Sequence, residues 1–200
     1  MGITIHYKGS IRRLSEIDTL VDILEDFAKI LEWKTERYPS LSVTDKQADT
    51  DAFGIQQHQD RHYPRGIVVY PHESCEPFSF TFTKEKNLVD FRGSYLQNRT
   101  ESPGWLHVKT QFAPVDSHIA IIKLMKYLRG SFIPDLEVKD EGGYWESEDE
   151  KQLESRMESL NQAMGSLEEG FTVIPKDVFR NRSAEEIADL IERLLKRNRE

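Results

Sequence analysis

The chain has 200 residues, the size of one ordinary globular domain. Hydrophobic residues make up 38% of it and charged residues 31%, with ten Phe, seven Tyr and three Trp, which excludes a disordered chain, a collagen-like chain and a disulfide-rich scaffold. The net charge of −8 argues against nucleic acid as a partner, because an acidic surface repels the phosphate backbone.

Cysteine content and apolar run length indicate the compartment. Cys75 is the only cysteine, so no disulfide can form within the chain, as is usual in a reducing compartment. The first residues show no basic start followed by an apolar run, and the longest apolar stretch, 119–122, is far below the ~20 residues that span a bilayer. We therefore expect a cytoplasmic protein that does not enter a membrane.

The first third of the chain predicts a strand, a helix and a polar connection. Residues 3–7 alternate and contain β-branched side chains, as strands do. Residues 15–33 carry apolar side chains at steps of three and four, which predicts an amphipathic helix. Residues 39–64 are mostly Ser, Thr, Asp, Gln and His, and predict a long polar loop.

The middle of the chain predicts an antiparallel sheet with one covered face and one solvated face, because apolar and polar residues alternate in it. The expected strands cover residues 66–70, 78–83, 88–91 and 105–112. In the last of these, the residues expected to face the core are Leu106, Val108, Thr110 and Phe112. The residues expected on the opposite face are His107, Lys109 and Gln111.

The remaining pattern predicts a central helix over 114–130, a short strand over 136–139, and helices over 146–167 and 183–195. This order of elements predicts an α+β fold. We expect a two-layer sandwich, with a mainly antiparallel sheet of about five or six strands packed on helices. The whole chain, 1–200, would form one domain, with residues 146–200 as its helical C-terminal extension.

Three stretches, 108–112, 116–118 and 138–146, together resemble a recurring segment of uncharacterised bacterial proteins. The resemblance runs over residues 108–146. It implies a bacterial, cytoplasmic origin. It implies no activity and assigns no role to any residue.

Histidine and cysteine spacing raises the possibility of zinc. His58 and His62 are four residues apart, and His72 and Cys75 are three apart, so each pair could hold two ligands of one tetrahedral ion. We favour the alternative that these are exposed loop side chains, because there is one sulfur and no Cys-x-x-Cys pair. No cofactor is therefore expected. The acids beside Cys75 also disfavour its thiolate, and with it nucleophilic catalysis.

A second group of residues predicts acid–base chemistry or ligand binding. In this hypothesis His118 is the acid–base group, Glu141 is its partner and Lys109 contacts an anion. The residues expected to line or contact the ligand are Gln111, Tyr144 and Trp145. A small-molecule-binding protein or enzyme built on this pocket is the alternative function.

The hypothesis that we favour is a non-catalytic binding or interaction module. Charge is segregated, because residues 140–158 hold eight acids against two bases. The same region carries a narrow apolar seam of Leu153, Met157, Leu160 and Met164. A narrow apolar seam on a helix packs against a second apolar surface. We therefore expect the helices of 146–200 to contact a protein partner or a second copy of the chain.

Overall fold

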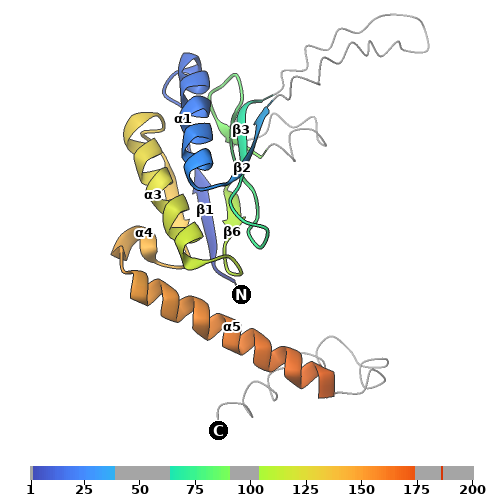
Figure 1. The fold of residues 1–200 in the computed structure, drawn as a ribbon. Coiled ribbons are helices and arrows are strands. Elements are labelled where there is room, and N and C mark those ends of the chain that lie inside the picture. Colours follow the sequence, from blue (N-terminus) through green and yellow to red (C-terminus); the bar gives the residue numbers. More distant parts are fainter. Residues whose placement is uncertain (1, 39–63, 91–103, 174–185, 187–200) are drawn as a thin grey trace, which may run out of the picture.

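The computed structural model of the chain describes residues 2–38, 64–90, 104–173 and 186 (Figure 1). Within these residues the fold is α+β, as the sequence predicts. Two antiparallel sheets of three and four strands pack with the helices, and their buried residues form one hydrophobic cluster.

The three-stranded sheet has the order β6-β1-β7, with β1 (Thr4–Lys8) between β6 (Leu106–Lys109) and β7 (Glu137–Asp140). Ile5 and Tyr7 of β1 are buried, and the residues that alternate with them are half-buried. One face of this sheet therefore belongs to the core, and the other carries polar side chains, which is the expected pattern for an antiparallel sheet.

The four-stranded sheet has the order β2-β3-β4-β5: β2 (Lys34–Tyr38), β3 (Arg65–Tyr70), β4 (Phe78–Phe82) and β5 (Leu88–Val89). The sequence does not predict β2, because its residues are polar and it has no buried position. β2 pairs with β3 along its whole length, so tertiary pairing rather than apolar alternation defines this strand.

Tyr7 joins the two sheets. Its hydroxyl donates to the carbonyl oxygen of Ser79 at 2.9 Å and accepts from the amide N–H of Ser79 at 3.0 Å. Its ring lies 5.6 Å from that of Phe80. Both Tyr7 and Ser79 are buried, so this contact satisfies backbone groups of β4 that water does not reach.

Four α-helices accompany the sheets in the described residues: α1 (Ile17–Ile30), α3 (Val115–Ser131), α4 (Tyr144–Ser147) and α5 (Glu150–Val173). A short 3-10 turn, Leu14–Glu16, precedes α1. The expected end of the first helix at Trp33 is wrong. The helix ends at Ile30, and Glu32, with a φ of 57°, turns the chain into β2.

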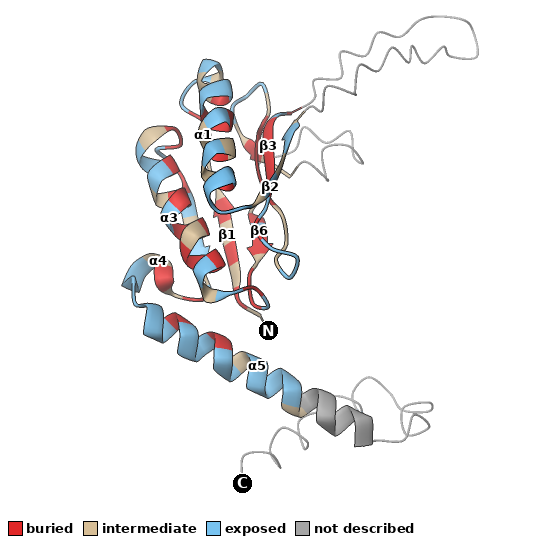
Figure 2. Cartoon of the chain, viewed as in Figure 1, coloured by how far each residue is buried: buried red, intermediate tan, exposed pale blue. Residues whose placement is uncertain are grey.

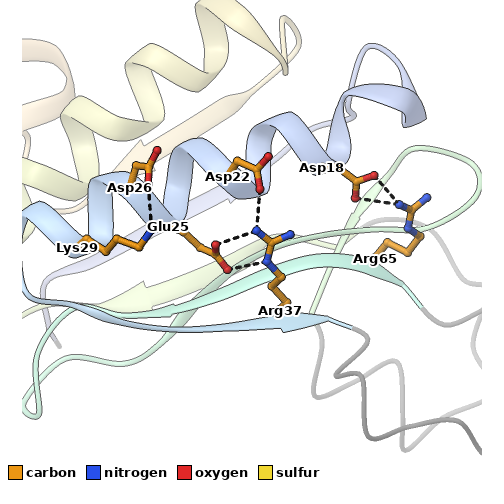
Figure 3. Close-up of polar contacts among 7 residues, drawn as sticks. All are labelled: Asp18, Asp22, Glu25, Asp26, Lys29, Arg37 and Arg65. Atoms are coloured by element: carbon orange, nitrogen blue, oxygen red, sulfur yellow. Dashed lines mark hydrogen bonds and ion pairs between the residues drawn. The ribbon is translucent and has the colours of Figure 1, made fainter.

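Ion pairs attach α1 to β2 and β3 (Figure 3). Arg37 of β2 binds both carboxylate oxygens of Glu25, at 2.7 and 2.8 Å, and also Asp22 at 2.7 Å. These hydrogen bonds, first to Glu25 and then to Asp22, raise the pKa of Arg37 above its ordinary value. Arg65 of β3 donates from Nη2 to both carboxylate oxygens of Asp18, at 3.0 and 3.2 Å. The acidic side of α1 therefore holds the charged strand in place.

Helix α5 packs on the rest of the chain through its first turns and then extends away from it (Figures 1 and 2). Leu153 and Met157 are buried in the main hydrophobic cluster, and Leu160 packs against its edge. Met164 is 45% exposed. The seam expected to contact a partner is thus divided, since its first half covers the protein's own core.

Candidate functional site

His118 lies in the first turn of α3 and is completely buried. Its Nδ1 lies 2.7 Å from the hydroxyl oxygen of Thr110, and its Nε2 lies 3.2 Å from Oδ1 of Asp140. Thr110 is buried too, and the Asp140 side chain has no exposed surface. The three groups resemble a catalytic triad in type, but a substrate in solvent has no access to the imidazole. We interpret them as a structural polar cluster.

Asp140 connects this cluster to the turn between β7 and α4. Oδ1 accepts the amide N–H of Gly142 at 2.7 Å, and Oδ2 accepts that of Trp145 at 3.0 Å. Burial raises the pKa of Asp140, but the contact with His118 and the two amide N–H groups lower it more, so the pKa lies below its ordinary value. The carboxylate is therefore ionised at neutral pH and fixes the start of α4.

The turn itself requires glycine at two positions. Gly143 has a φ of 77°, in the left-handed region that favours glycine. A Cβ on Gly142 would lie 2.7 Å from Leu153 and 3.0 Å from Cε1 of His118. The two glycines thus let the backbone pass between the polar cluster and α5.

The predicted pairing of His118 with Glu141 is wrong. Glu141 follows the end of β7, where successive side chains point to opposite faces of the sheet. Asp140 faces His118, whereas Glu141 faces away from it: Oε2 accepts the amide N–H of Thr4 at 3.0 Å and Oε1 lies 3.7 Å from Nε2 of His6. Asp140 is the carboxylate that meets His118, the role that the sequence analysis gave to Glu141.

Lys109 and Gln111 also lie in different surroundings. The ammonium group of Lys109 lies 5.2 Å from the centre of the Phe112 ring, and its backbone bonds to Glu76. Gln111, expected beside Lys109, is 1% exposed, whereas Phe112, expected in the core, is 53% exposed. The reason is that the strand ends at Lys109 and a turn closed by Ala113 and Thr110 replaces the alternation.

The two aromatic residues of the predicted pocket lie on α4. Tyr144 is buried, and Trp145 is half-buried against the cationic groups of Lys126 and Arg129, at 5.5 and 6.0 Å from its ring centre. Both cations belong to α3. The structure therefore distributes the predicted pocket residues over separate surroundings and does not assemble the pocket beside Lys109.

The zinc hypothesis is tested only in part, because His58 and His62 lie outside the described residues. Nδ1 of His72 accepts the amide N–H of Ser74 at 3.0 Å, and the thiol of Cys75 donates to the carbonyl oxygen of Lys109 at 3.6 Å. Burial, and then Glu76, raise the pKa of Cys75 to about 12, which disfavours the thiolate that zinc needs. No group of three or more metal-binding side chains forms in the described part of the chain.

The sequence analysis missed a polar surface on the outer face of the three-stranded sheet. His6 of β1 lies between His107 of β6 and Lys139 of β7 in the strand register. The ammonium groups of Lys8 and Lys139 lie 4.9 and 4.5 Å from the centre of the Trp105 ring. Alternation within each strand implies outward side chains, but only the strand order shows that these particular residues are neighbours.

A groove lies between the start of β1 and α5. Its lining residues are Ile3, Glu141, Ser155, Arg156, Ser159 and Leu160. The groove is largely open to solvent, and its volume of about 370 Å³ is at the lower end of the volumes of small-molecule sites, roughly 300–1,000 Å³. Of the residues that the sequence analysis singled out as a site, Glu141 alone contributes to it. Its lining residues are far apart in the sequence, from Ile3 to Leu160, so no local sequence pattern predicts the groove.

Comparisons with protein families, with curated proteins and with solved structures give no match for this chain. The resemblance of residues 108–146 to uncharacterised bacterial proteins therefore stays a prediction. Among the helices of the described residues, none combines the length and the apolar character that crossing a bilayer requires.

Proposed function

We propose that the protein is a non-catalytic binding module and that the distal half of α5 contacts its partner, which is a second copy of the chain. The observation that carries this proposal is the way in which α5 leaves the rest of the fold. The helix has 24 residues, a length of about 36 Å, yet its fully buried side chains are Leu153 and Met157, among those described.

The exposed part of α5 is a poor helix by itself. From Glu158 to Ser166 no side chain is fully buried, and isolated helices of this length are marginal in water. Exposed acids at Glu150, Glu154 and Glu158 follow one another at intervals of four residues, where like charges destabilise a helix. A partner that covers Leu160 and Met164 would stabilise it.

A second copy fits this surface in an antiparallel arrangement. Residues 159–167 of α5 carry no charge, and they lie between the acids at Glu150, Glu154 and Glu158 and the acids at Glu168 and Glu169. Two antiparallel helices crossing near Met164 would bring these uncharged turns together at the crossing point. The buried apolar contact would then contain no charged side chain of α5 at its centre.

The experiment is sedimentation equilibrium of the full chain over a wide range of concentrations, with Met164→Glu as the test variant. We expect the wild-type protein to be a dimer and Met164→Glu to be a monomer, because the new carboxylate would have to be buried in the contact. Gln162→Glu is the matched control, since Gln162 is exposed and points away from the seam.

A dimer of Gln162→Glu with wild-type affinity would locate the contact on the Leu160–Met164 side of the helix. A wild-type protein that stays monomeric at every concentration would contradict the proposal. A dimer that Met164→Glu leaves unchanged would contradict it as well, because the contact would then lie elsewhere.

A further inference from the structure

The groove beside α5 holds two opposite charges that do not pair with each other. Glu141 lies on the sheet side and Arg156 on the helix side. Within the described residues, the ion pairs include none between these two side chains and none between Arg156 and any other carboxylate. Opposite charges that share a groove without contact leave room for a ligand that bridges them.

Each of these charges is held in place by the backbone. Oε2 of Glu141 accepts the amide N–H of Thr4 and Oε1 lies 3.7 Å from Nε2 of His6, so the carboxylate is fixed, and its oxygens can each accept a further hydrogen bond. Nη1 of Arg156 donates to the carbonyl oxygens of Glu141 and Gly142, at 3.4 and 3.1 Å. The other edge of the guanidinium is then available for a carboxylate, the group that its planar fork matches best.

The rest of the lining is apolar or small. Leu160 is half-buried and offers the apolar surface of the groove, whereas Ile3 is buried beneath it. Ser155 and Ser159 have short side chains that leave space, and the hydroxyl of Ser159 already donates to the carbonyl oxygen of Ser155. One cation, one anion and one apolar surface therefore face the same small volume.

We propose that this groove binds a free amino acid with an apolar side chain. The carboxylate of the ligand binds the free edge of Arg156, and its ammonium group binds Glu141. Its side chain lies against Leu160. This site shares Leu160 with the proposed partner contact, whereas its two charged residues, Glu141 and Arg156, do not belong to that seam, and binding does not require the partner.

The test is a titration followed by the amide chemical shifts of the protein, with L-leucine as the probe. Isocaproate has the carboxylate and side chain of leucine without the amine, and isoamylamine has the amine and side chain without the carboxylate. We expect leucine to bind about tenfold more tightly than either, because each lost charged hydrogen bond costs roughly one power of ten in affinity. The shifts should centre on Glu141 and Arg156.

Two variants test the contributions of the two charges one at a time. Glu141→Gln keeps an acceptor for Thr4 and should lower leucine affinity to that of isocaproate, whose own affinity is unchanged or higher. Arg156→Gln should lower leucine affinity to that of isoamylamine. Ser159→Trp fills the groove and should abolish all three interactions. Lys151→Gln is the control, because Lys151 is exposed on α5 outside the groove.

Leucine binding no tighter than that of isocaproate and isoamylamine would overturn the proposal. So would binding that survives Ser159→Trp. The same titration in Met164→Glu shows whether self-association matters: unchanged leucine binding in a monomeric variant supports a site within one copy, and lost binding there contradicts it.

Discussion

At the scale of single residues, the position of one carboxylate decides how the chain is interpreted. The sequence shows His118 and two adjacent acids, Asp140 and Glu141, at the end of β7. The partner of His118 is Asp140 and not Glu141, a difference of one residue along the strand. Adjacent residues of a strand lie on opposite faces of the sheet, so the side chain of Asp140 points into the core and that of Glu141 to the solvated face. The acid–base pair that we expected is therefore replaced by a buried cluster that holds Gly142 and Trp145 through Asp140.

Asp140→Asn tests the importance of this cluster. Removing one partner of a buried pair costs about 3–5 kcal/mol, so we expect a large loss in the free energy of unfolding at neutral pH. Because the folded pKa of Asp140 lies below its ordinary value of 3.8, its carboxylate stabilises the fold above that value. This stability is lost as the pH falls through the folded pKa.

The measurement is urea unfolding of both proteins from neutral pH down to about pH 3. The difference between wild type and Asp140→Asn should narrow at the acid end. Asp116→Asn is the control, since Asp116 is exposed in the same first turn of α3. Its cost should stay below about 1 kcal/mol. Equal stability of wild type and Asp140→Asn at neutral pH would refute the structural role.

At the scale of elements, the sequence predicts those that contain their own apolar pattern. α1, α3, β3 and β4 are expected and observed, because their apolar residues repeat with the helical period or form short apolar runs. The expectation of one solvated face is wrong for β4, because all five of its residues are buried. β2 is missed, since its position depends on Arg37 and on pairing with β3. The separation of α4 from α5 is also missed, because it rests on the left-handed backbone of Glu148, at a φ of 53°.

The two halves of the α5 seam should differ in their effect on folding. Leu153 is completely buried, so Leu153→Ala should lower the free energy of unfolding by about 2–5 kcal/mol. Met164→Ala should change it by less than about 0.5 kcal/mol, because Met164 is 45% exposed. Thermal and urea unfolding at low protein concentration, where self-association is weak, measure both. Similar costs for the two variants would show that the seam is not divided.

At the scale of the whole molecule, the two sheets share one hydrophobic core, and Tyr7 is one of the residues that connect them. Tyr7→Phe keeps the ring against Phe80 but removes the hydroxyl that serves both backbone groups of Ser79. We expect a loss of about 1–3 kcal/mol, the cost of leaving buried polar groups without partners.

Faster hydrogen exchange at the Ser79 amide is the specific sign of that loss, and amide exchange measured by NMR would detect it. Tyr127→Phe is the control, since Tyr127 is 49% exposed on α3. If Tyr7→Phe and Tyr127→Phe unfold at the same urea concentration, the hydrogen bonds between Tyr7 and Ser79 contribute nothing to the stability of the contact between the two sheets.

The order of the three-stranded sheet also has a consequence for synthesis on the ribosome. The central strand, β1, comes first along the chain, yet both of its neighbours come much later: Ile5 pairs with Val108 and with Asp140. The pairing of β3 with β4 joins residues close in sequence and can form early. β1 must therefore remain without its strand partners while more than half of the chain emerges, and this sheet closes last.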